Sequence, residues 1–391
     1  MKKNICMIVY TDYTKDTRVR REAETLALLP EYDVTILALK SGVAPRNYSL
    51  DGVRVLEMNE RKYRGKRTIK YLLSYARFFL LSFISCTWLI ILGQIDIIHV
   101  HNMPNFLVFA SIFPRLLGKY IILDIHDTVP ETFLVKFNRP SPLLVKLLYF
   151  EESISCLFAD RIICVNHVQS DALIKRGIPS DKITISMNVP DDKRFNPKNN
   201  KRPNRSKDET FKIVYHGTIA KRLGIDLIIR AVAFLSDKID SLELNIWGDG
   251  DDQNEFIWLA KELNIQDRVY FKMPGFAIDQ LPAKLGHMDV GIVGNRKNIA
   301  TELMLPIKML EYIALGIPVV VPKLKGIEYY FSDEMVCYFE PENVDSMASA
   351  ILKLYKDESL RKMQAKKAKT FLNQYGWNKH KMELIRLYKT L

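Results

Sequence analysis

The chain has 391 residues, 48% of them hydrophobic and 26% charged, which describes an ordinary globular protein long enough for two domains. Its 57 Lys and Arg residues outnumber the 45 Asp and Glu residues, and the net charge of +12 favours acidic partners such as nucleotides or anionic lipid. The basic residues are dispersed and are not interleaved with aromatic residues on one element, so we do not expect a nucleic-acid partner.

The five cysteines are scattered along the chain and form no CxxC pair. We therefore expect reduced, buried thiols in a cytosolic protein. The apolar run after the N-terminal lysines covers only residues 5–9 and leads into a polar loop. It predicts a first strand and not a signal peptide.

The first 40 residues predict a strand, a helix and a second strand, as at the start of a doubly wound α/β domain. Their predicted bounds are 4–10, 16–29 and 34–39. The turn after the first strand contains no glycine, so it lacks the GxGxxG fingerprint of nicotinamide cofactors. Asp12, Arg18 and Arg21 can reach a ligand from this turn, or they belong to a capped and solvated helix start.

A very apolar segment, residues 71–92, contains one charge, Arg77, and as a helix would reach ~33 Å, enough to cross a bilayer. Predicted strands of one sheet precede and follow it, and a single crossing would split that sheet between two compartments. We therefore predict a helix of the first domain, either buried in the core or lying at a membrane surface. The basic stretch just before it favours the membrane surface: Arg61, Lys62, Arg64, Lys66, Arg67 and Lys70.

Two further predicted strands end in polar residues, the first in His101 and Asn102 and the second in His126 and Asp127. Ligands bind at the carboxyl ends of strands in an open parallel sheet, so these four side chains mark a candidate site. His126 beside Asp127 can position or polarise a hydroxyl, or it is a hydrogen-bonded loop histidine. His99 and His101 alternate onto one face, but the sequence offers no third ligand at useful spacing, so we expect no metal there.

The composition along the chain predicts an N-terminal domain (residues 1–190), a linker (191–210) and a C-terminal domain (211–370). We expect residues 371–391 to form a final helix that can pack back on the first domain. The linker is polar, basic and poor in apolar side chains. The N-terminal domain closes with strands predicted at 159–165 and 183–187. Residues 345–391 read as two helices.

The second domain opens with a strand, a loop and an amphipathic helix whose start suits a phosphate. Its glycines let the backbone approach a ligand and its loop supplies cations: Gly217, Lys221, Arg222 and Gly224. The next strand ends at Gly248, and Asp249 and Asp251 after it have the DxD spacing of some metal sites. The same GDG sequence is equally a tight turn, so we expect no metal there either.

Later in this domain the sequence predicts a helix at 306–315, closed by Gly316, and a buried strand at 319–321. Lys308 and Glu311 fall three residues apart on one face of that helix. The N–H groups and the dipole at the helix N-terminus favour a phosphate there, and Glu311, one turn deeper, can accept hydrogen bonds from hydroxyls. The alternative is a surface ion pair on an ordinary amphipathic helix.

These stretches resemble the motifs of bacterial retaining glycosyltransferases of the GT-B fold, family four. They run in the family's order over nearly the whole chain: DTRVRREAETLALLPEYDVTIL, DIIHVHNMPNF, LDIHDTVPE, ADRIICVNHV, VYHGTIAKRLGIDLIIRA, NIWGDGDD, RVYFKMPG and LPIKMLEYIALGIPVV. The resemblance implies an α/β protein with two Rossmann-like, doubly wound domains facing a cleft. It also implies a nucleotide-sugar donor on the C-terminal domain, an acceptor on the N-terminal domain, and neither a metal nor another cofactor.

The resemblance implies roles for particular residues as well. A carboxylate at Glu311 would bind the ribose, and basic residues near Arg222 would bind the diphosphate. His126 would contact the transferred sugar, and the backbone around Pro274 and Gly275 would border the base.

The chain departs from the family's pattern in two places. The family often has two glutamates eight positions apart, but Leu303 stands eight positions before Glu311, with Glu302 one place off. The basic residue usual before the helix glycine is here Leu223. As in a known variant of the motif, Lys308 would take a place near the phosphates.

Breaking the bond between the sugar and the diphosphate builds positive charge on the ring and negative charge on the leaving phosphate, so fixed cations help most in the transition state. We therefore predict that His126, Arg222 and Lys308 act at the reacting groups. The predicted donor contacts are Gly217, Lys221, Arg222, Gly248, Pro274, Gly275, Lys308 and Glu311. The predicted acceptor contacts are Asp12, Arg18, His101, Asn102 and Asp127.

Together these features predict a retaining, metal-independent glycosyltransferase of cell-surface polysaccharide biosynthesis. We expect a lipid-linked saccharide acceptor and a cytoplasmic protein peripheral to the inner face of the cytoplasmic membrane. Two other functions remain open: a nucleotide-sugar epimerase or hydrolase, and a catalytically silent scaffold of a polysaccharide-assembly complex. The motifs do not specify the sugar, the base, the linkage or the oligomeric state.

Overall fold

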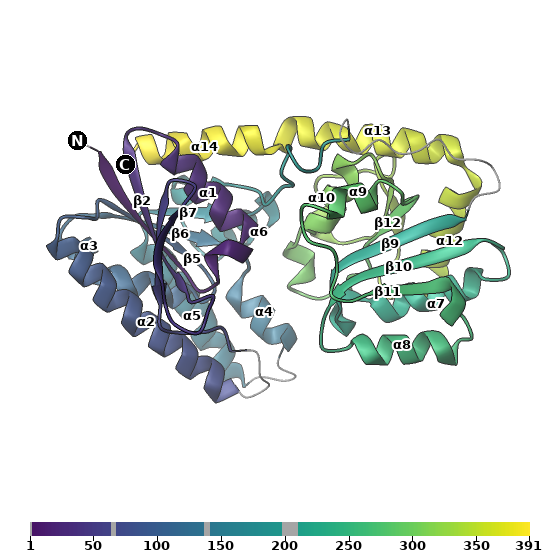
Figure 1. Ribbon diagram of the computed structural model, residues 1–391, viewed down its shortest axis with the longest axis horizontal. Helices are drawn as coiled ribbons and strands as arrows, with labels where there is room; N and C mark the ends of the chain where they lie inside the picture. Colours follow the sequence, from purple (N-terminus) through teal and green to yellow (C-terminus); the bar gives the residue numbers. More distant parts are fainter. Residues whose placement is uncertain (1, 64–67, 137–140, 198–209) are drawn as a thin grey trace. The chain divides into compact units, whose positions relative to one another are not determined.

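The computed structural model describes residues 2–63, 68–136, 141–197 and 210–391. They form two compact units, one of Met1–Asn188 with His380–Leu391 and the other of Val189–Lys379, which we call unit 1 and unit 2. In each unit helices pack on a mostly parallel sheet (Figure 1). This confirms the predicted α/β class with two Rossmann-like domains.

Unit 1 contains an eight-stranded sheet in the order β3-β4-β2-β1-β5-β6-β7-β8, parallel except for the pair β3 and β4. Its strands are β1 (Lys3–Val9), β2 (Tyr32–Leu39), β3 (Asn47–Leu50), β4 (Val53–Met58), β5 (Ile97–His101), β6 (Tyr120–Ile125), β7 (Arg161–Cys164) and β8 (Ile183–Ile185). The strands predicted at 4–10, 34–39, 159–165 and 183–187 are confirmed as β1, β2, β7 and β8. The β3–β4 hairpin is an addition that the sequence analysis missed.

Polar side chains, Asp16, Ser141 and Asn166, cap the start of three helices of unit 1. Asp16 accepts a hydrogen bond from the Val19 N–H at the start of α1, which confirms a helix in the region 16–29. The α-helices are α1 (Thr17–Ala27), α2 (Thr68–Ile91), α3 (Ile112–Leu116), α4 (Val129–Lys136), α5 (Pro142–Phe158), α6 (His167–Lys175) and α14 (Trp377–Lys389). Shorter 3-10 helices are η1 (Tyr13–Lys15), η2 (Asn105–Ser111) and η3 (Ser180–Lys182).

Unit 2 contains a six-stranded parallel sheet in the order β11-β10-β9-β12-β13-β14. Its strands are β9 (Phe211–Thr218), β10 (Leu242–Asp249), β11 (Val269–Lys272), β12 (Val290–Ile292), β13 (Val319–Pro322) and β14 (Cys337–Phe339). Its helices are α7 (Ile225–Leu235), α8 (Gln253–Glu262), α9 (Leu281–Leu285), α10 (Ile307–Ala314), α11 (Lys325–Glu328), α12 (Val344–Lys356) and α13 (Glu358–Tyr375), with η4 (Lys221–Leu223), η5 (Gln266–Arg268) and η6 (Thr301–Leu303). The helix predicted at 306–315 is confirmed as α10, and Gly316 after it takes the left-handed φ of 74°.

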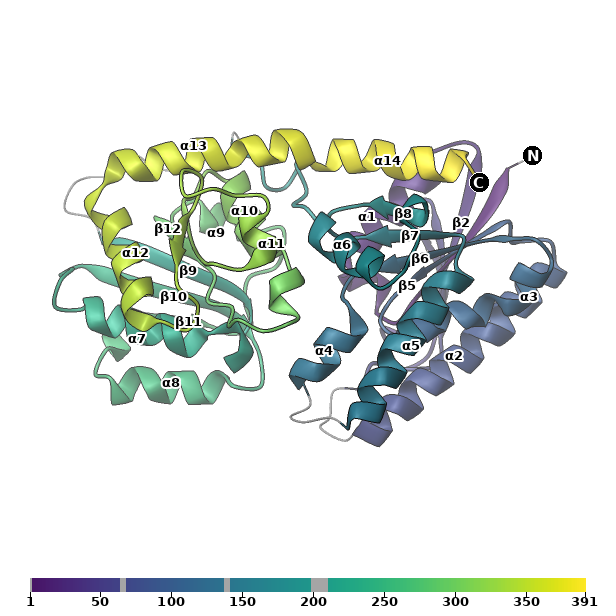
Figure 2. The same cartoon turned by 180° about the vertical axis from the view of Figure 1, so that it is seen from behind.

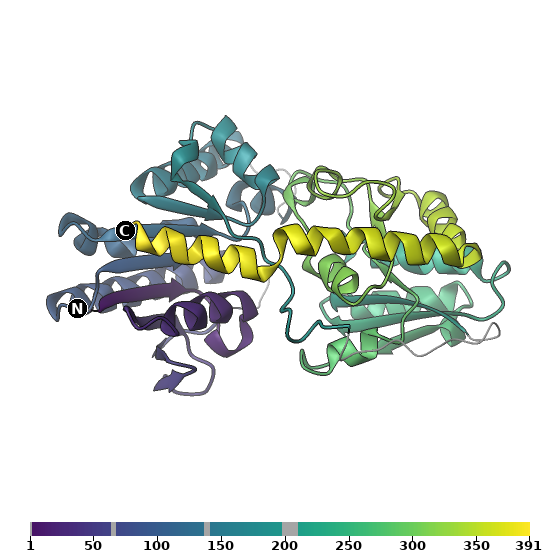
Figure 3. The same ribbon diagram turned by 90° about the horizontal axis from the view of Figure 1, so that it is seen from above.

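The prediction of two helices over 345–391 is wrong, because the structure has three there. Asp357 ends α12 and caps α13 by accepting a hydrogen bond from Leu360 N–H, and Gly376 separates α13 from α14. Residues 371–375 therefore belong to α13, and α14 alone is the final helix. It packs on unit 1 through Tyr388, whose hydroxyl is 2.8 Å from Nδ1 of His99 (yellow in Figure 3). Residues 198–209 of the predicted linker lie outside the described residues.

The apolar segment at 71–92 is confirmed as a helix, α2, which joins β4 to β5 of one sheet. It is the one helix of the described chain that is long and apolar enough to cross a membrane, with a mean hydropathy of 1.5 over Ile69–Ile91. Only 28% of its apolar window is buried. The alternative of a helix buried in the core therefore does not hold for most of the surface of α2. Arg64, Lys66 and Arg67 of the basic stretch lie outside the described residues, whereas Arg61, Lys62 and Lys70 are exposed.

Each unit has its own hydrophobic core between the sheet and its helices. All five cysteines are free and buried, which confirms the expectation of buried, unbridged thiols. Four of them, Cys6, Cys86, Cys156 and Cys164, lie in the core of unit 1, and Cys337 lies in that of unit 2.

The strand order locates the candidate sites. It reverses between β1 and β5 in unit 1 and between β9 and β12 in unit 2. In open parallel sheets ligands bind beyond the carboxyl ends of the strands at such a reversal. His101 and Asn102 lie there in unit 1, and Gly217 lies there in unit 2.

Candidate functional site

In unit 2 the side chain of Lys308 lies beside the carboxyl end of β9. Lys308 follows the first residue of α10, and its Nζ is 3.9 Å from the centre of the Tyr215 ring. A Cβ on Gly217 would lie 3.3 Å from that Nζ, so the glycine leaves room for the ammonium. Burial lowers the pKa of Lys308 to about 7, an effect that Glu311 opposes and Arg222 increases. Near neutral pH the amine is therefore partly protonated, and an anion bound at this helix N-terminus would favour its charged form.

Glu311, one turn further along α10, is held by a histidine. Its Oε2 is 2.6 Å from Nε2 of His216 on β9, and Nδ1 of His216 is 2.9 Å from the hydroxyl of Tyr312. Within the described chain the other oxygen, Oε1, has no hydrogen-bond partner and is not buried. Glu311 is only 7% exposed and pairs with His216, so the alternative of a surface ion pair with Lys308 is wrong.

Three glycines at this edge of the sheet allow close backbone contacts. Gly248 lies opposite Gly217 in the register of β9 and β10. A Cβ on Gly248 would lie 1.8 Å from the carbonyl oxygen of Gly217, and one on Gly275 would lie 3.1 Å from the Gly248 nitrogen. The structure thus brings Gly217, Gly248 and Gly275 together, with Pro274 exposed next to Gly275. A residue larger than glycine at these positions would block this edge of the sheet.

The two cations of the loop after β9 differ in their partners. Arg222 is exposed, and its side chain forms no ion pair or hydrogen bond with any residue that the structure describes. Lys221 instead forms a surface ion pair with Glu255 of α8 at 3.2 Å. Gly224 takes a left-handed φ of 68° and starts α7, as the sequence predicts. Arg222 is therefore the cation of this loop that remains available to an anion.

Leu303 occupies the position where the family often has a first glutamate, and the neighbouring Glu302 does not replace that glutamate. Oε2 of Glu302 accepts a hydrogen bond from the Lys325 N–H at the start of α11, and its Oε1 is 3.4 Å from Nζ of Lys297. Its carboxylate thus already stabilises the contact between η6 and α11. We assign Glu302 this structural role.

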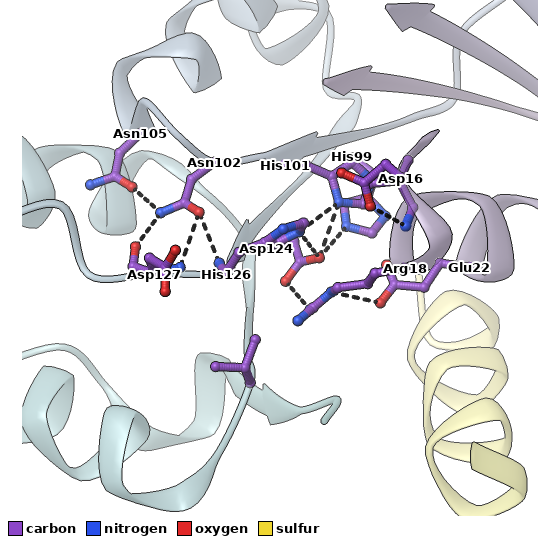
Figure 4. Close-up of polar contacts among 12 residues, drawn as sticks. Asp16, Arg18, Glu22, His99, His101, Asn102, Asn105, Asp124, His126 and Asp127 are labelled. Carbon is purple, nitrogen blue, oxygen red and sulfur yellow. Dashed lines mark hydrogen bonds and ion pairs between the residues drawn. The ribbon is translucent and has the colours of Figure 1, made fainter. Parts of the chain in front are cut away.

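In unit 1 the site is built around Asp124, the fifth residue of β6 (Figure 4). Its Oδ1 accepts a hydrogen bond from Arg18 of α1 at 2.6 Å. Its Oδ2 is 3.0 Å from Nδ1 of His101 on the neighbouring strand β5 and 2.9 Å from Nε2 of His126. Arg18 also lies 3.3 Å from Oε1 of Glu22. One carboxylate therefore connects two strands and a helix.

The charges in this group are set by their neighbours. Burial disfavours the ionised form of Asp124, but Arg18, His126 and His101 hold its pKa well below the usual range. Burial lowers the pKa of His101 well below its usual value, and the charge of the neighbouring His99 lowers it further. Asp124 is therefore ionised and His101 neutral at physiological pH.

Three of the predicted acceptor contacts are buried side chains. Arg18, His101 and Asn102 are 4%, 0% and 6% exposed. Arg18 contacts Asp124 and Glu22, Nδ1 of His101 contacts Asp124, and Asn102 binds the loop after β6. Contact of these three side chains with an acceptor stays a prediction. Asp12 caps η1 through Thr14 N–H and pairs with Lys15, as in a capped helix start, but the buried Arg18 is not solvated.

Asn102 fixes the backbone of the loop that carries His126. Its Oδ1 accepts a hydrogen bond from the His126 N–H at 2.8 Å, and its Nδ2 donates to the carbonyl of Asp127 at 2.7 Å (Figure 4). Nδ2 also donates to Oδ1 of Asn105 at 2.9 Å. His126 and Asp127 remain partly exposed, so they are the predicted unit 1 residues that can reach a ligand.

Two carboxylates that could act as metal ligands lie close to His99 and His101 in the structure. Glu22 and Asp124 join His99 and His101, with one ligand atom of each within 4.8 Å of the others. Arg18 already contacts both carboxylates, and the two imidazole rings are stacked at 4.2 Å and 28°. Lone pairs in the planes of stacked rings run nearly parallel and do not converge on one ion. The arrangement therefore fits a guanidinium better than a metal.

The DxD sequence of unit 2 behaves as a turn. Oδ1 of Asp249 accepts a hydrogen bond from Gly250 N–H at 3.0 Å, and Asp249 is exposed. This bond joins neighbouring residues at the end of β10. The alternative of a tight turn therefore explains the GDG sequence.

Two residues that organise these sites, His216 and Asp124, are not among the predicted site residues. Each stands in a predicted strand, one or two positions before a residue that was selected. A polar residue inside an otherwise apolar strand is the signal that could have identified them, because a buried polar group requires a partner.

Comparisons with known proteins agree with this architecture. Residues 196–371 match the family described as glycosyl transferases group 1, and residues 17–194 match glycosyltransferase family 4. A protein of Escherichia coli assigned to colanic acid biosynthesis as the glycosyltransferase WcaL is 25% identical over 186 residues. The match covers 47% of this chain and 44% of that relative, so it spans less than half of either.

Solved structures of similar fold cover the whole chain. Sucrose-phosphate synthase from Thermosynechococcus elongatus has a TM-score of 0.79 at 17% identity, covering 100% of this chain and 99% of that one. The HepE protein of Anabaena, solved in complex with UDP, has a TM-score of 0.69 at 13% identity and covers 100% of both chains. At these identities the likeness concerns the fold.

Proposed function

The chain belongs to the GT-B glycosyltransferases of family four, and from that premise we propose that it transfers a sugar from a nucleotide-sugar donor to a saccharide acceptor in cell-surface polysaccharide biosynthesis. The observation that carries this proposal is the group of Lys308, Gly217 and Glu311 at the strand reversal of unit 2. It combines a cationic side chain, a glycine-lined backbone edge and a carboxylate oxygen that has no hydrogen-bond partner among the described residues.

These groups suit the parts of a nucleoside diphosphate. The N-terminus of α10 attracts the two phosphates together with Lys308 and Arg222, which is unpaired among the residues that the structure describes. The free Oε1 of Glu311 accepts hydrogen bonds from the two ribose hydroxyls, while His216 holds Oε2. The glycines at 217, 248 and 275 let the donor lie against the backbone. A nucleotide-diphosphate sugar is therefore the donor class we propose.

The reaction we propose needs neither a bound metal nor a covalent nucleophile. Negative charge that develops on the leaving diphosphate is stabilised by Lys308, Arg222 and the helix N-termini, in the role that a metal has in other transferases. The acceptor hydroxyl attacks the anomeric carbon on the face from which the diphosphate leaves, so the anomeric configuration is retained. Its proton passes to a phosphate oxygen of the leaving group.

On the acceptor side we propose His126 and Asp127. Both follow β6 and are partly exposed, and Asn102 holds their backbone. Their polar atoms suit the hydroxyls of the acceptor and of the transferred sugar.

We propose a lipid-linked acceptor because unit 1 carries an apolar patch on three neighbouring helices. Figure 2 shows α2, α3 and α5 together on one side of unit 1. The patch consists of the exposed side chains Leu72, Leu73, Leu80, Ile84, Trp88, Ile91, Ile112, Phe113, Leu116, Leu143, Leu147 and Phe150. The cations Arg61, Lys62 and Lys70 precede or begin α2 and are exposed. Apolar side chains beside cations suit the inner face of the cytoplasmic membrane, where a cytoplasmic protein would meet lipid-linked saccharides.

Product analysis tests the proposed reaction. Purified protein is incubated with a panel of nucleotide sugars, with and without lipid-extracted acceptors and in EDTA, and the products are separated by chromatography. We expect nucleoside diphosphate and a glycosylated acceptor with the donor's anomeric configuration, formed only when both substrates are present. Glu311→Gln should lose this activity, whereas Glu334→Gln, at an exposed glutamate paired with Lys367, should keep it.

The other functions predict different products. An epimerase alters the sugar without an acceptor, and a hydrolase releases free sugar from the donor alone. A folded protein that consumes no donor with any acceptor would instead be the catalytically silent scaffold.

Vesicle flotation tests the membrane contact. We expect binding to anionic vesicles at low salt, lost in the double variant Ile84→Glu with Trp88→Glu and lost when Arg61, Lys62, Arg64, Lys66 and Arg67 are neutralised together. Trp258→Glu is a matched control, because Trp258 on α8 is 61% exposed, as Trp88 is. Equal flotation of all variants would contradict the membrane contact.

A further inference from the structure

The two ring nitrogens of His126 have different surroundings. Nε2 faces Asp124 Oδ2 at 2.9 Å, whereas Nδ1 has no partner in the described chain and is not buried. The side chain as a whole is 21% exposed. One nitrogen therefore serves the protein, and the other is available to a ligand.

Asp124 determines which nitrogen of His126 carries the proton. An ionised carboxylate only accepts hydrogen bonds, so each group that points at it must donate. Oδ1 of Asp124 accepts a hydrogen bond from Arg18, and Oδ2 accepts hydrogen bonds from Nδ1 of His101 and Nε2 of His126. In neutral His126 the single ring proton then lies on Nε2, and the lone pair lies on Nδ1.

His101 does not change this assignment. Its Nδ1 is 3.2 Å from Nε2 of His126, but it also faces Oδ2 of Asp124 at 3.0 Å. Both imidazoles satisfy the same oxygen by donating to it, and a bond from one histidine to the other would leave Oδ2 with one donor fewer.

We propose that Asp124, held by Arg18, is a positioning residue that keeps His126 in the tautomer with its proton on Nε2, so that Nδ1 accepts a hydrogen bond from a sugar hydroxyl. Nothing in the resemblance or in the comparisons assigns Asp124 or Arg18 this role. The inference rests on the proposed function only for the identity of the hydroxyl. The tautomer itself follows from the contacts of Asp124.

The structure separates the ring of His126 from its backbone. Asn102 holds the His126 N–H, and Asp124 holds the ring. Changing Asp124 therefore alters the proton on the ring without releasing the loop. In Asp124→Asn the amide oxygen must turn to Arg18, which only donates, and the amide N–H then faces His126. Nε2 must become the acceptor, and the proton moves to Nδ1.

Nitrogen NMR on the wild-type protein tests the tautomer without any assay of transfer. Histidines labelled with ¹⁵N give well-separated signals for protonated and bare ring nitrogens, and loss of one set in His126→Gln assigns His126 among the seven histidines. At pH 8 we expect a protonated Nε2 and a bare Nδ1. A protonated Nδ1, or both nitrogens protonated, would overturn the proposal.

The Asp124→Asn variant tests the consequence for function. We expect its His126 proton to move to Nδ1 and kcat/KM to fall about 10- to 100-fold, as for a lost hydrogen bond, with the dissociation constant of the nucleotide unchanged. Glu152→Gln is the control, because Glu152 is another buried carboxylate of unit 1 that pairs with an arginine, Arg176. Its His126 signals and kcat/KM should match the wild type.

The outcomes separate the two proposals. If the wild type has the expected tautomer but transfers no sugar, the proposed function fails and the role of Asp124 in setting the tautomer stands. If transfer occurs and Asp124→Asn leaves both the tautomer and kcat/KM unchanged, the positioning role is wrong. Should Asp124→Asn fail to fold, the wild-type spectrum alone still decides the tautomer.

Discussion

The carboxylate of Glu311 on α10 lies 2.6 Å from Nε2 of His216 on β9, and this bond orients Glu311 toward the edge of the sheet. His216→Phe should weaken nucleotide binding by about 1.5–3 kcal/mol, since it removes a hydrogen bond to a charged group that fixes one carboxylate oxygen. Isothermal titration calorimetry with nucleoside diphosphates measures this loss. His287→Phe, at an exposed histidine of the same unit, is the control and should bind as the wild type does. If His216→Phe bound nucleotides with unchanged affinity, Glu311 would not be a contact of the nucleotide.

Nucleotide binding should depend on pH through Lys308. The pKa of Lys308 is about 7 in the free protein, and a bound diphosphate raises it by adding negative charge nearby. Below pH 7 Lys308 is already protonated, so its contribution to binding is constant. As the pH rises above 7, binding must take up a proton, and the affinity falls by up to about tenfold per pH unit until the pKa of the complex is reached.

Calorimetry in two buffers of different ionisation enthalpy measures this proton uptake. Lys308→Arg keeps the charge without titrating in this range, so its affinity should be flat from pH 7 to 9. A wild-type dissociation constant that is equally flat would show that Lys308 does not contact the diphosphate.

Arg222→Ala should slow transfer more than it weakens donor binding. Arg222 is exposed and unpaired within the described chain, so it is free to follow charge that develops on the leaving diphosphate. We expect kcat to fall about 100-fold with a change in donor dissociation constant of less than about threefold. Equal losses in both quantities would mean that Arg222 only holds the ground state. Lys221→Ala, which removes a surface ion pair, serves as the neighbouring comparison.

The final helix should stabilise unit 1 through Tyr388. Its buried hydroxyl is 2.8 Å from Nδ1 of His99, and its ring packs edge-on against Tyr32. Tyr388→Phe should lower the free energy of unfolding by about 1 kcal/mol, and the melting temperature by about 2–4 °C. Differential scanning calorimetry measures the change. The control is Tyr270→Phe, where the hydroxyl bonds a surface carbonyl, and it should shift the melting temperature little.

Helix α10 is predictable because its signals are local. Pro306 suits the helix start, Gly316 suits the left-handed position after its end, and the positions of Met309 and Ile313 have the spacing of a buried face. All of these follow from the positions of residues within one helix. The same holds for the apolar strands of the two parallel sheets.

The partners of the site residues are not predictable in this way. His216 meets Glu311 across 95 positions of the chain, and Arg18 meets Asp124 across 106. A local pattern shows that Arg18 begins a helix but not that its side chain points into the sheet. The contact of Arg18 with an acceptor stays a prediction, and its bond to Asp124 could not be predicted from the local pattern.

The β3–β4 hairpin and the exposure of α2 were also not predictable from local sequence patterns. The β3–β4 hairpin has the turn sequence Asp51-Gly52, both with positive φ, but no residue of its edge strand β3 is buried, so the apolar pattern is weak there. Helix α2 is apolar on all sides, and the sequence could not distinguish a core helix from a surface helix. The structure does so, because Phe78 and Cys86 are buried and Ile84 and Trp88 are exposed.

A thermal-shift panel of UDP, GDP, ADP and CMP with their common sugars, on wild type and Glu311→Ala, tests the central claim most directly. A ligand at a hundred times its dissociation constant should stabilise the wild type by about 2.7 kcal/mol, which corresponds to roughly 5–10 °C. The account predicts a shift with the nucleotides of one base that is much smaller in Glu311→Ala. No shift with any nucleotide, or the same shift in both proteins, would contradict a donor site at Lys308 and Glu311.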